Sequence, residues 1–201
     1  HRIIHAGIQL QALRVLRSVV LQHRLQFLHV WRRQPRTGSS RLINKLQGLK
    51  KPKHPKYFIG FSDNTALHLF LSQEWGWKTI HGSGLNSLLQ PEQDPQNFLK
   101  IAEIIHNQKP TEINDLEPLN AKAQKLLIKN AKPITAKLTG GNLTLLANSI
   151  GTPWQIQTKG KILFIEETSE KGYAVDRSLY HLKQAGLFKG VKAIVLGDFE
   201  E

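Results

Sequence analysis

The stretch that decides the fold is Tyr57-Phe58-Ile59-Gly60-Phe61-Ser62-Asp63-Asn64-Thr65-Ala66-Leu67-His68. An apolar run leads through Gly60 into Ser62, and residues 65–71 then follow the pattern of an amphipathic helix. The sequence therefore predicts a strand that turns sharply into a helix at Ser62. This is the geometry of a nucleophile elbow, in which a tight turn exposes a serine hydroxyl beside unpaired N–H groups. The alternative is that Ser62 or Asp63 is an ordinary helix N-cap, because both residue types are favoured there.

The positive charge of the chain is confined to its first quarter. The 201 residues carry a net charge of +13, with 28 Lys+Arg against 15 Asp+Glu. Residues 1–56 hold 13 Lys+Arg and no acidic residue, which leaves 28 − 13 = 15 basic residues against 15 acidic ones from residue 57 onward. Because that larger part is neutral overall, we expect no nucleic-acid partner there. No apolar run approaches the ~20 residues that span a bilayer, so no membrane partner is expected either.

Residues 1–38 differ in composition from the rest of the chain. They contain seven of the nine arginines and no lysine, whereas the chain from Lys45 onward has nineteen lysines and one arginine. One interpretation is a basic amphipathic helix, because leucine and valine recur at helical spacing between arginines over residues 10–24. A second is a transit peptide, whose Arg-rich, acid-free composition is similar. A third, which we favour, is that an upstream reading-frame change replaced the native sequence of this segment.

Two predicted strands end in residues of the kinds that bind ligands or take part in catalysis. A strand over residues 79–81 leads into the glycine-rich loop His81-Gly82-Ser83-Gly84, and α/β proteins bind ligands at such loops. His81 is either a pocket-lining group or simply a strand-end histidine. A buried strand over residues 161–167 ends in Glu166 and Glu167. Carboxylates in this position lie at the carboxyl edge of a sheet, where catalytic groups are commonly found.

The remaining pattern predicts an α/β protein. Helices are expected over residues 41–49, 95–106 and 176–185, and a second buried strand over residues 191–196. The polar residues 107–135 are interrupted by three prolines, which predicts a domain boundary. We therefore divide the chain into an atypical Arg-rich segment (1–38), a nucleophile-bearing α/β domain (39–106), a linker region (107–135) and a partial C-terminal domain (136–201).

Four pieces of residues 39–201, standing in this order, resemble the LD-carboxypeptidase family of muramoyl-tetrapeptide carboxypeptidases and microcin-immunity serine peptidases. They are Gly60-Phe61-Ser62-Asp63 with Thr65-Ala66-Leu67, then Thr79-Ile80-His81-Gly82, then Leu138-Thr139-Gly140-Gly141-Asn142-Leu143, then Ile162-Leu163-Phe164-Ile165-Glu166-Glu167 with Tyr173, Asp176 and Arg177. The resemblance implies an α/β fold with a three-layer N-terminal lobe, incomplete in this chain, and a smaller C-terminal lobe. It also implies a cytoplasmic serine peptidase that releases the terminal D-alanine from murein tetrapeptide in peptidoglycan recycling.

The resemblance assigns catalytic roles residue by residue. Ser62 is the expected nucleophile, and the N–H of Asp63 is an expected oxyanion-hole donor, with Gly38 at the place of the second donor. Glu166 is expected to orient the histidine base of a Ser-Glu-His triad, because a triad needs an acid that fixes the tautomer of the base. Glu167 is the less favoured alternative, since neighbouring strand residues point to opposite faces.

The resemblance also points to a ligand. His81 and Gly82 are expected to bind the substrate, a muropeptide, and a homodimer is compatible with the family. No metal or organic cofactor is implied. The chain has no cysteine, which excludes a thiolate metal site and a cysteine nucleophile.

The chain departs from the family pattern at both ends. Family members carry an Arg-Gly-Gly-Tyr-Gly loop before the helix that in this chain begins at Ser39, whereas this chain has Arg33-Gln34-Pro35-Arg36-Thr37-Gly38. The catalytic histidine of the family lies in a Gly-His segment beyond the strand at 191–196, and none of the nine histidines of this chain occupies that place. His68 and His181 are interpreted as structural. We therefore expect a family member that lacks both ends and is impaired in catalysis.

Two other classes of function stay open. The first is a non-catalytic muropeptide-binding module, or self-immunity remnant, that uses the cleft of the same family. The second is a nucleic-acid or membrane-surface protein that uses the Arg-rich segment, whose binding would depend steeply on salt.

Overall fold

The computed structural model describes residues 38–82, 95–107, 113, 116–128 and 131–200. The three interpretations of the Arg-rich segment therefore concern residues outside the described ones, as does the second half of the predicted glycine-rich loop. The expected α/β class is confirmed, because two parallel sheets alternate with helices along the chain. In the described ranges, every helix is too short or too polar to cross a membrane.

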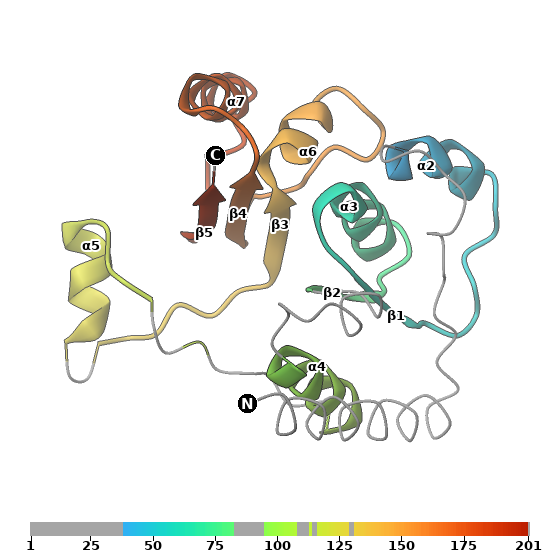
Figure 1. Ribbon diagram of the computed structural model, residues 1–201, viewed down its shortest axis with the longest axis horizontal. Coiled ribbons are helices and arrows are strands. Elements are labelled where there is room, and N and C mark those ends of the chain that lie inside the picture. Colours follow the sequence, from blue (N-terminus) through green and yellow to red (C-terminus); the bar gives the residue numbers. More distant parts are fainter. Residues whose placement is uncertain (1–37, 83–94, 108–112, 114–115, 129–130, 201) are drawn as a thin grey trace, which may run out of the picture.

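The N-terminal lobe is built on a pair of parallel strands. Its elements are α2 (Ser39–Gln47), β1 (Tyr57–Gly60), the 3-10 turn η1 (Ser62–Asn64), α3 (Thr65–Gln73), β2 (Lys78–His81) and α4 (Pro95–Asn107). The register places Gly60 of β1 opposite His81 of β2. Figure 1 shows α3 and α4 on opposite sides of this strand pair, which gives the three layers expected of this lobe.

The C-terminal lobe is a three-stranded parallel sheet in the order β3-β4-β5. Its elements are β3 (Leu138–Asn142), α6 (Leu143–Asn148), β4 (Ile162–Thr168), α7 (Gly172–Gln184) and β5 (Ala193–Glu200). The region expected to be a linker carries α5 (Ala121–Gln124) and the 3-10 turn η3 (Lys125–Leu127), which stand apart from both sheets in Figure 1. The register of β3 and β4 places Asn142 opposite Glu166.

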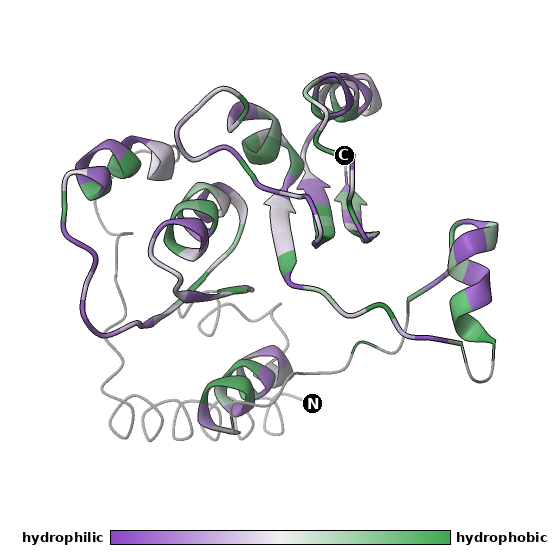
Figure 2. Ribbon diagram, turned by 180° about the vertical axis from the view of Figure 1, so that it is seen from behind, coloured by the Kyte–Doolittle hydropathy of each residue, from purple (hydrophilic) through white to green (hydrophobic). Residues whose placement is uncertain are grey.

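One hydrophobic core joins the two lobes. Every residue from Thr65 to Leu71 in α3 is buried, as expected of a helix that is covered on all sides. The core cluster includes Phe70 of α3 together with Leu143 of α6 and Leu163 of β4. Figure 2 shows hydrophobic turns in both α3 and α6, the helices that bring the two lobes into contact. The elbow at Ser62 leads directly into α3 and is therefore supported by this shared core.

Candidate active site

The predicted strand-to-helix turn at Ser62 is confirmed. Ser62 has φ 56°, one of two non-glycine residues with positive φ in the described part of the chain. The N–H of Asn64 donates to the carbonyl of Phe61 at 3.1 Å, which closes the turn. Gly60 is required in this turn, because a Cβ at this position would lie 2.8 Å from Asn64 Nδ2. The result is an exposed Ser62 side chain, as a nucleophile elbow needs.

The carboxylate of Asp63 anchors the start of α2 to this turn. Its Oδ2 accepts from the N–H of Ser39 at 2.8 Å and from the N–H of Gly38 at 3.3 Å. The hydroxyl of Ser39 donates to the Asp63 carbonyl. Because the first N–H groups of a helix have no partner within it, Asp63 acts as a cap supplied from another segment.

The two expected oxyanion donors therefore differ in their surroundings. The N–H of Gly38 already faces the Asp63 carboxylate, at 3.3 Å. The N–H of Asp63 has no backbone acceptor within the described ranges. The oxyanion role of both residues stays a prediction.

His68 lies buried beneath the elbow. Its Nε2 is 2.9 Å from the Gly60 carbonyl, so the neutral ring carries its proton on Nε2 and donates it. Burial lowers the pKa of His68 to about 4, the Gly60 hydrogen bond opposes this shift, and nearby His81 adds to it. The Gly60 carbonyl also accepts from the N–H of Gly82 at 2.9 Å. His68 is thus structural, as expected, and the Gly82 N–H is engaged in the sheet.

His81 faces Glu166 across the junction of the two lobes. Its Nε2 lies 3.5 Å from Glu166 Oε1, and the two side chains are 25% and 15% exposed. The His81 ring also contacts the rings of His68 and Phe164, with centroids 5.7 Å and 5.4 Å away. The structure thus brings the expected triad acid together with a residue expected to bind substrate. The catalytic role of Glu166 and the substrate contact of His81 stay predictions.

Glu167 points the other way and is fully engaged in structure. It is 3% exposed, and its carboxylate accepts from Asn142 Nδ2 at 2.6 Å and from the N–H and hydroxyl of Thr144 at 2.9 Å and 2.7 Å. A further bond comes from the N–H of Thr168 at 3.0 Å. Glu167 therefore caps the start of α6, and the preference for Glu166 as the site acid agrees with the opposite faces of the two residues.

Asn142 and Thr65 connect the lobes in a way that the sequence does not predict. The N–H of Asn142 donates to Thr65 Oγ1 at 3.0 Å. Close approach is possible because of the two preceding glycines. A Cβ on Gly141 would lie 2.6 Å from Thr65 Oγ1, and one on Gly140 would lie 1.8 Å from the Phe164 carbonyl oxygen. The only sequence signal for this contact is the Gly-Gly-Asn run itself.

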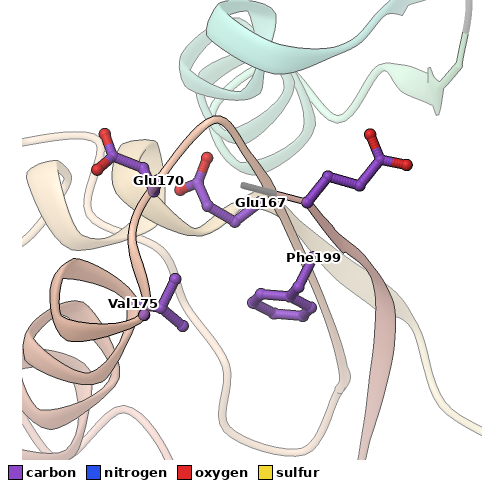
Figure 3. Close-up of a pocket in the computed structure, with 6 residues that line it drawn as sticks. Glu167, Glu170, Val175 and Phe199 are labelled. Carbon is purple, nitrogen blue, oxygen red and sulfur yellow. The ribbon is translucent and has the colours of Figure 1, made fainter.

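A separate pocket of about 200 Å³ lies on the Glu167 side of the sheet. It is lined by Glu167, Glu170, Gly172, Val175, Phe199 and Glu200. Figure 3 shows Val175 and Phe199 on the same side of the strands, with Glu170 on the loop after β4. Neither Ser62 nor Glu166 lines this pocket, so the two neighbouring glutamates do not share one cavity. Among the described residues, no group of three or more His, Asp and Glu side chains is arranged to hold a metal ion.

Comparison with known proteins identifies the family. Residues 36–82 match the LD-carboxypeptidase N-terminal domain, and residues 135–201 match the LD-carboxypeptidase C-terminal domain. A protein of Rickettsia conorii named "Putative carboxypeptidase" is 55% identical over 171 residues, which cover 85% of this chain and 53% of the relative. The "Probable murein peptide carboxypeptidase" of Bacillus subtilis is 36% identical over 148 residues, covering 73% of this chain and 44% of the relative.

Solved structures agree with these relatives. The MccF-like protein of Bacillus anthracis superposes with a TM-score of 0.64 at 27% identity, covering 82% of this chain and 55% of that one. The muramoyltetrapeptide carboxypeptidase of Oxalobacter formigenes gives a TM-score of 0.55 at 29% identity, covering 73% and 47%. The chain spans about half the length of the curated relatives that it matches. Matches to both domains in the expected order, on the fold of the solved relatives, show that this chain belongs to the LD-carboxypeptidase family.

Proposed function

We propose that the protein is a serine LD-carboxypeptidase that releases the terminal D-alanine of murein tetrapeptide. The observation that carries the proposal is the exposed Ser62 at positive φ, on a turn whose next N–H has no backbone acceptor within the described ranges. A strained backbone held at such a point is typical of active sites. The proposed setting is peptidoglycan recycling in the cytoplasm, which rests on the family alone.

The proposed reaction proceeds by acylation of Ser62. The Ser62 oxygen attacks the carbonyl carbon before the D-residue while its proton passes to a base, and the N–H of Asp63 donates to the oxyanion. The base then gives the proton to the leaving nitrogen as the C–N bond breaks, which frees D-alanine. Water hydrolyses the acyl-serine in the second half of the reaction. Glu166 orients and stabilises the base.

The base is the part of this triad that the described residues do not supply. The Ser62 hydroxyl makes no hydrogen bond to any histidine in the described part of the chain, and the buried His68 instead donates to Gly60. We therefore expect slow D-alanine release from these 201 residues alone. A chimera that joins the C-terminal part of the Rickettsia conorii relative to the end of this chain, and so supplies a candidate base, should release it faster.

The test is D-alanine release from muramoyl tetrapeptide by this chain and by the chimera, with Ser62→Ala versions of both. Release that depends on Ser62 supports the proposal. Release that survives Ser62→Ala overturns it. Saturable binding of the tetrapeptide without release from either form favours the alternative, a non-catalytic muropeptide-binding or self-immunity remnant. Absence of both binding and release excludes a muropeptide ligand.

A further inference from the structure

His81 is anchored in the N-terminal lobe next to the nucleophile elbow. It is the last residue of β2 and pairs in register with Gly60, two residues before Ser62. The N–H that follows it, from Gly82, donates to the Gly60 carbonyl at 2.9 Å. Any shift of the His81 backbone would therefore be transmitted to the strand that leads into the elbow.

The imidazole of His81 is held between two rings that come from different lobes. The His68 ring, from α3, lies with its centroid 5.7 Å away at an interplanar angle of 41°. The Phe164 ring, from β4, lies 5.4 Å away at 65°. Since Phe164 and Glu166 are two residues apart on one strand, they point to the same face of the sheet. The ring contact and the carboxylate contact of His81 therefore belong to one surface.

A glycine on the neighbouring strand leaves space for the side chains of Phe164 and Glu166. Gly197 of β5 lies beside them, and a Cβ at that position would be 3.0 Å from Phe164 Cε2 and 3.1 Å from Glu166 Cβ. A larger residue at position 197 would displace the side chains of Phe164 and Glu166 and so change their distance from His81. The absence of a side chain at Gly197 thus leaves space for Phe164 and Glu166 in their present positions.

Among the described residues, His81 is the ionic partner of a buried Glu166 carboxylate oxygen. The Glu166 Oε1 is buried and has no hydrogen bond within the described ranges. The nearest ionic partner is Nε2 of His81, at 3.5 Å. That separation is about 0.5 Å longer than an ordinary N–H···O bond, and such contacts in unliganded active sites commonly tighten when a ligand binds.

We propose that His81 is a positioning residue that orients the Glu166 carboxylate from the opposite lobe. It is not placed as the base of the triad, because Nε2 faces Glu166 while Nδ1 is buried and has no partner among the described residues. This inference rests on the proposed function in so far as Glu166 orients the catalytic base. In physical terms, the packing of the two lobes against each other places His81 where it sets the orientation of the Glu166 carboxylate.

The first test needs no turnover. Nitrogen-15 spectra of the histidine rings should show a shifted His81 Nε2 resonance in Glu166→Gln, with the resonances of the exposed His181 on α7 unchanged. His81 itself is intact in this variant, so a folding defect at that position cannot obscure the result. An unchanged His81 Nε2 resonance would overturn the inference whether or not the protein releases D-alanine.

The second test measures D-alanine release in the chimera with the Rickettsia conorii C-terminal region. His81→Phe keeps an aromatic ring but loses the donor, and we expect kcat to fall roughly 10- to 100-fold with KM within about twofold. His81→Gln, which restores a donor, should recover most of the rate, and the matched control His181→Phe should match the parent. In a Glu166→Gln background, His81→Phe should have no further effect on kcat.

The outcomes separate the two proposals. A rise in KM alone, without loss of kcat, would make His81 a substrate contact and overturn the positioning role. Equal losses in His81→Phe and His81→Gln would do the same. If the parent protein releases no D-alanine, the proposed function fails, and the nitrogen-15 comparison still decides whether His81 orients Glu166.

Discussion

The N–H of Asn142 donates to Thr65 Oγ1 across 3.0 Å, which joins the last residue of β3 to the first residue of α3. Both residues are buried, at 5% and 0% exposure. Because α3 begins three residues after Ser62, this single bond ties the C-terminal lobe to the turn that carries Ser62. Its loss would leave a buried N–H without a partner, which is costly in a protein interior.

Replacement of Thr65 by valine removes that acceptor while it keeps the shape of the side chain. We expect Thr65→Val to lower the free energy of unfolding by about 1–3 kcal/mol, the usual effect of an unsatisfied buried donor. Thr65→Ser, which keeps the hydroxyl and loses one methyl group, should cost about 1 kcal/mol. Urea unfolding of the three proteins measures both values. A valine variant as stable as the parent would show that the bond contributes nothing.

Replacement of Glu167 should lower mainly the stability of the protein, whereas replacement of Glu166 should lower mainly its catalytic activity. Glu167→Gln turns an amide toward groups that all donate hydrogen bonds, so we expect the free energy of unfolding to fall by at least about 2 kcal/mol. Glu166→Gln should change it by less than about 1 kcal/mol, since His81 is the only ionic partner of its carboxylate in the described ranges.

Activity should follow the opposite order. In the chimera with the Rickettsia conorii C-terminal part, D-alanine release by Glu166→Gln should fall about 10⁴-fold, as when a triad acid loses its charge. Parallel unfolding curves and release assays on the two variants provide the measurement. The assignment of Glu166 would be wrong if Glu167→Gln folded normally and Glu166→Gln did not.

His68 should make stability depend on pH in the acid range. The folded pKa of about 4 lies below the ordinary 6.5, so the unfolded chain binds the proton more readily between these values. The contribution of neutral His68 to the free energy of unfolding is therefore complete above about pH 6.5. It is lost as the pH falls toward 4, by roughly 3 kcal/mol in total. His68→Gln keeps a donor for the Gly60 carbonyl and does not titrate. The difference between the two proteins should therefore shrink from pH 7 to pH 4, and a constant difference would show that burial of His68 does not lower its pKa.

The positive φ of Ser62 should lower the free energy of unfolding, because the backbone is strained at this residue. A residue with a Cβ costs about 1–2 kcal/mol in this conformation, whereas glycine adopts it freely. We therefore expect Ser62→Gly to unfold at higher urea concentration than Ser62→Ala, with a free-energy difference of about 1 kcal/mol. Both variants lack the hydroxyl, so neither should release D-alanine. Equal stability of the two variants would mean that the turn relaxes once the serine is replaced.

Much of the fold can be predicted from local patterns. The turn at Ser62, the buried strand that carries Glu166 and Glu167, and the helix that contains His181 all lie where periodicity places them, with boundaries that differ by a few residues. The helix expected over residues 176–185 instead begins at Gly172 and ends at Gln184. Boundaries shift in this way because helix ends depend on capping bonds as well as on apolar spacing.

The candidate site is less accessible to sequence analysis. Ser62 can be predicted because the turn and the serine are adjacent in the chain. The contact of His81 with Glu166 cannot, because residues 81 and 166 meet only after α3 has packed between the two lobes. In the same way, the sequence offers Asp63 as an N-cap of the helix that follows it, yet its carboxylate accepts from the N–H of Ser39 and caps α2 from 24 residues away.

The amino-acid sequence alone determined the α/β class, the strand-to-helix turn at Ser62 and the carboxylates at the end of a buried strand. These features follow from interactions over a few residues, such as strand alternation, helical spacing and the steric freedom of Gly60. Only the tertiary structure decided which groups each of the two glutamates meets on its own side of β4. Glu167 is drawn to the unpaired N–H groups at the start of α6, and Glu166 is left facing His81, because the packing of one sheet against the other lobe fixes what each strand face meets.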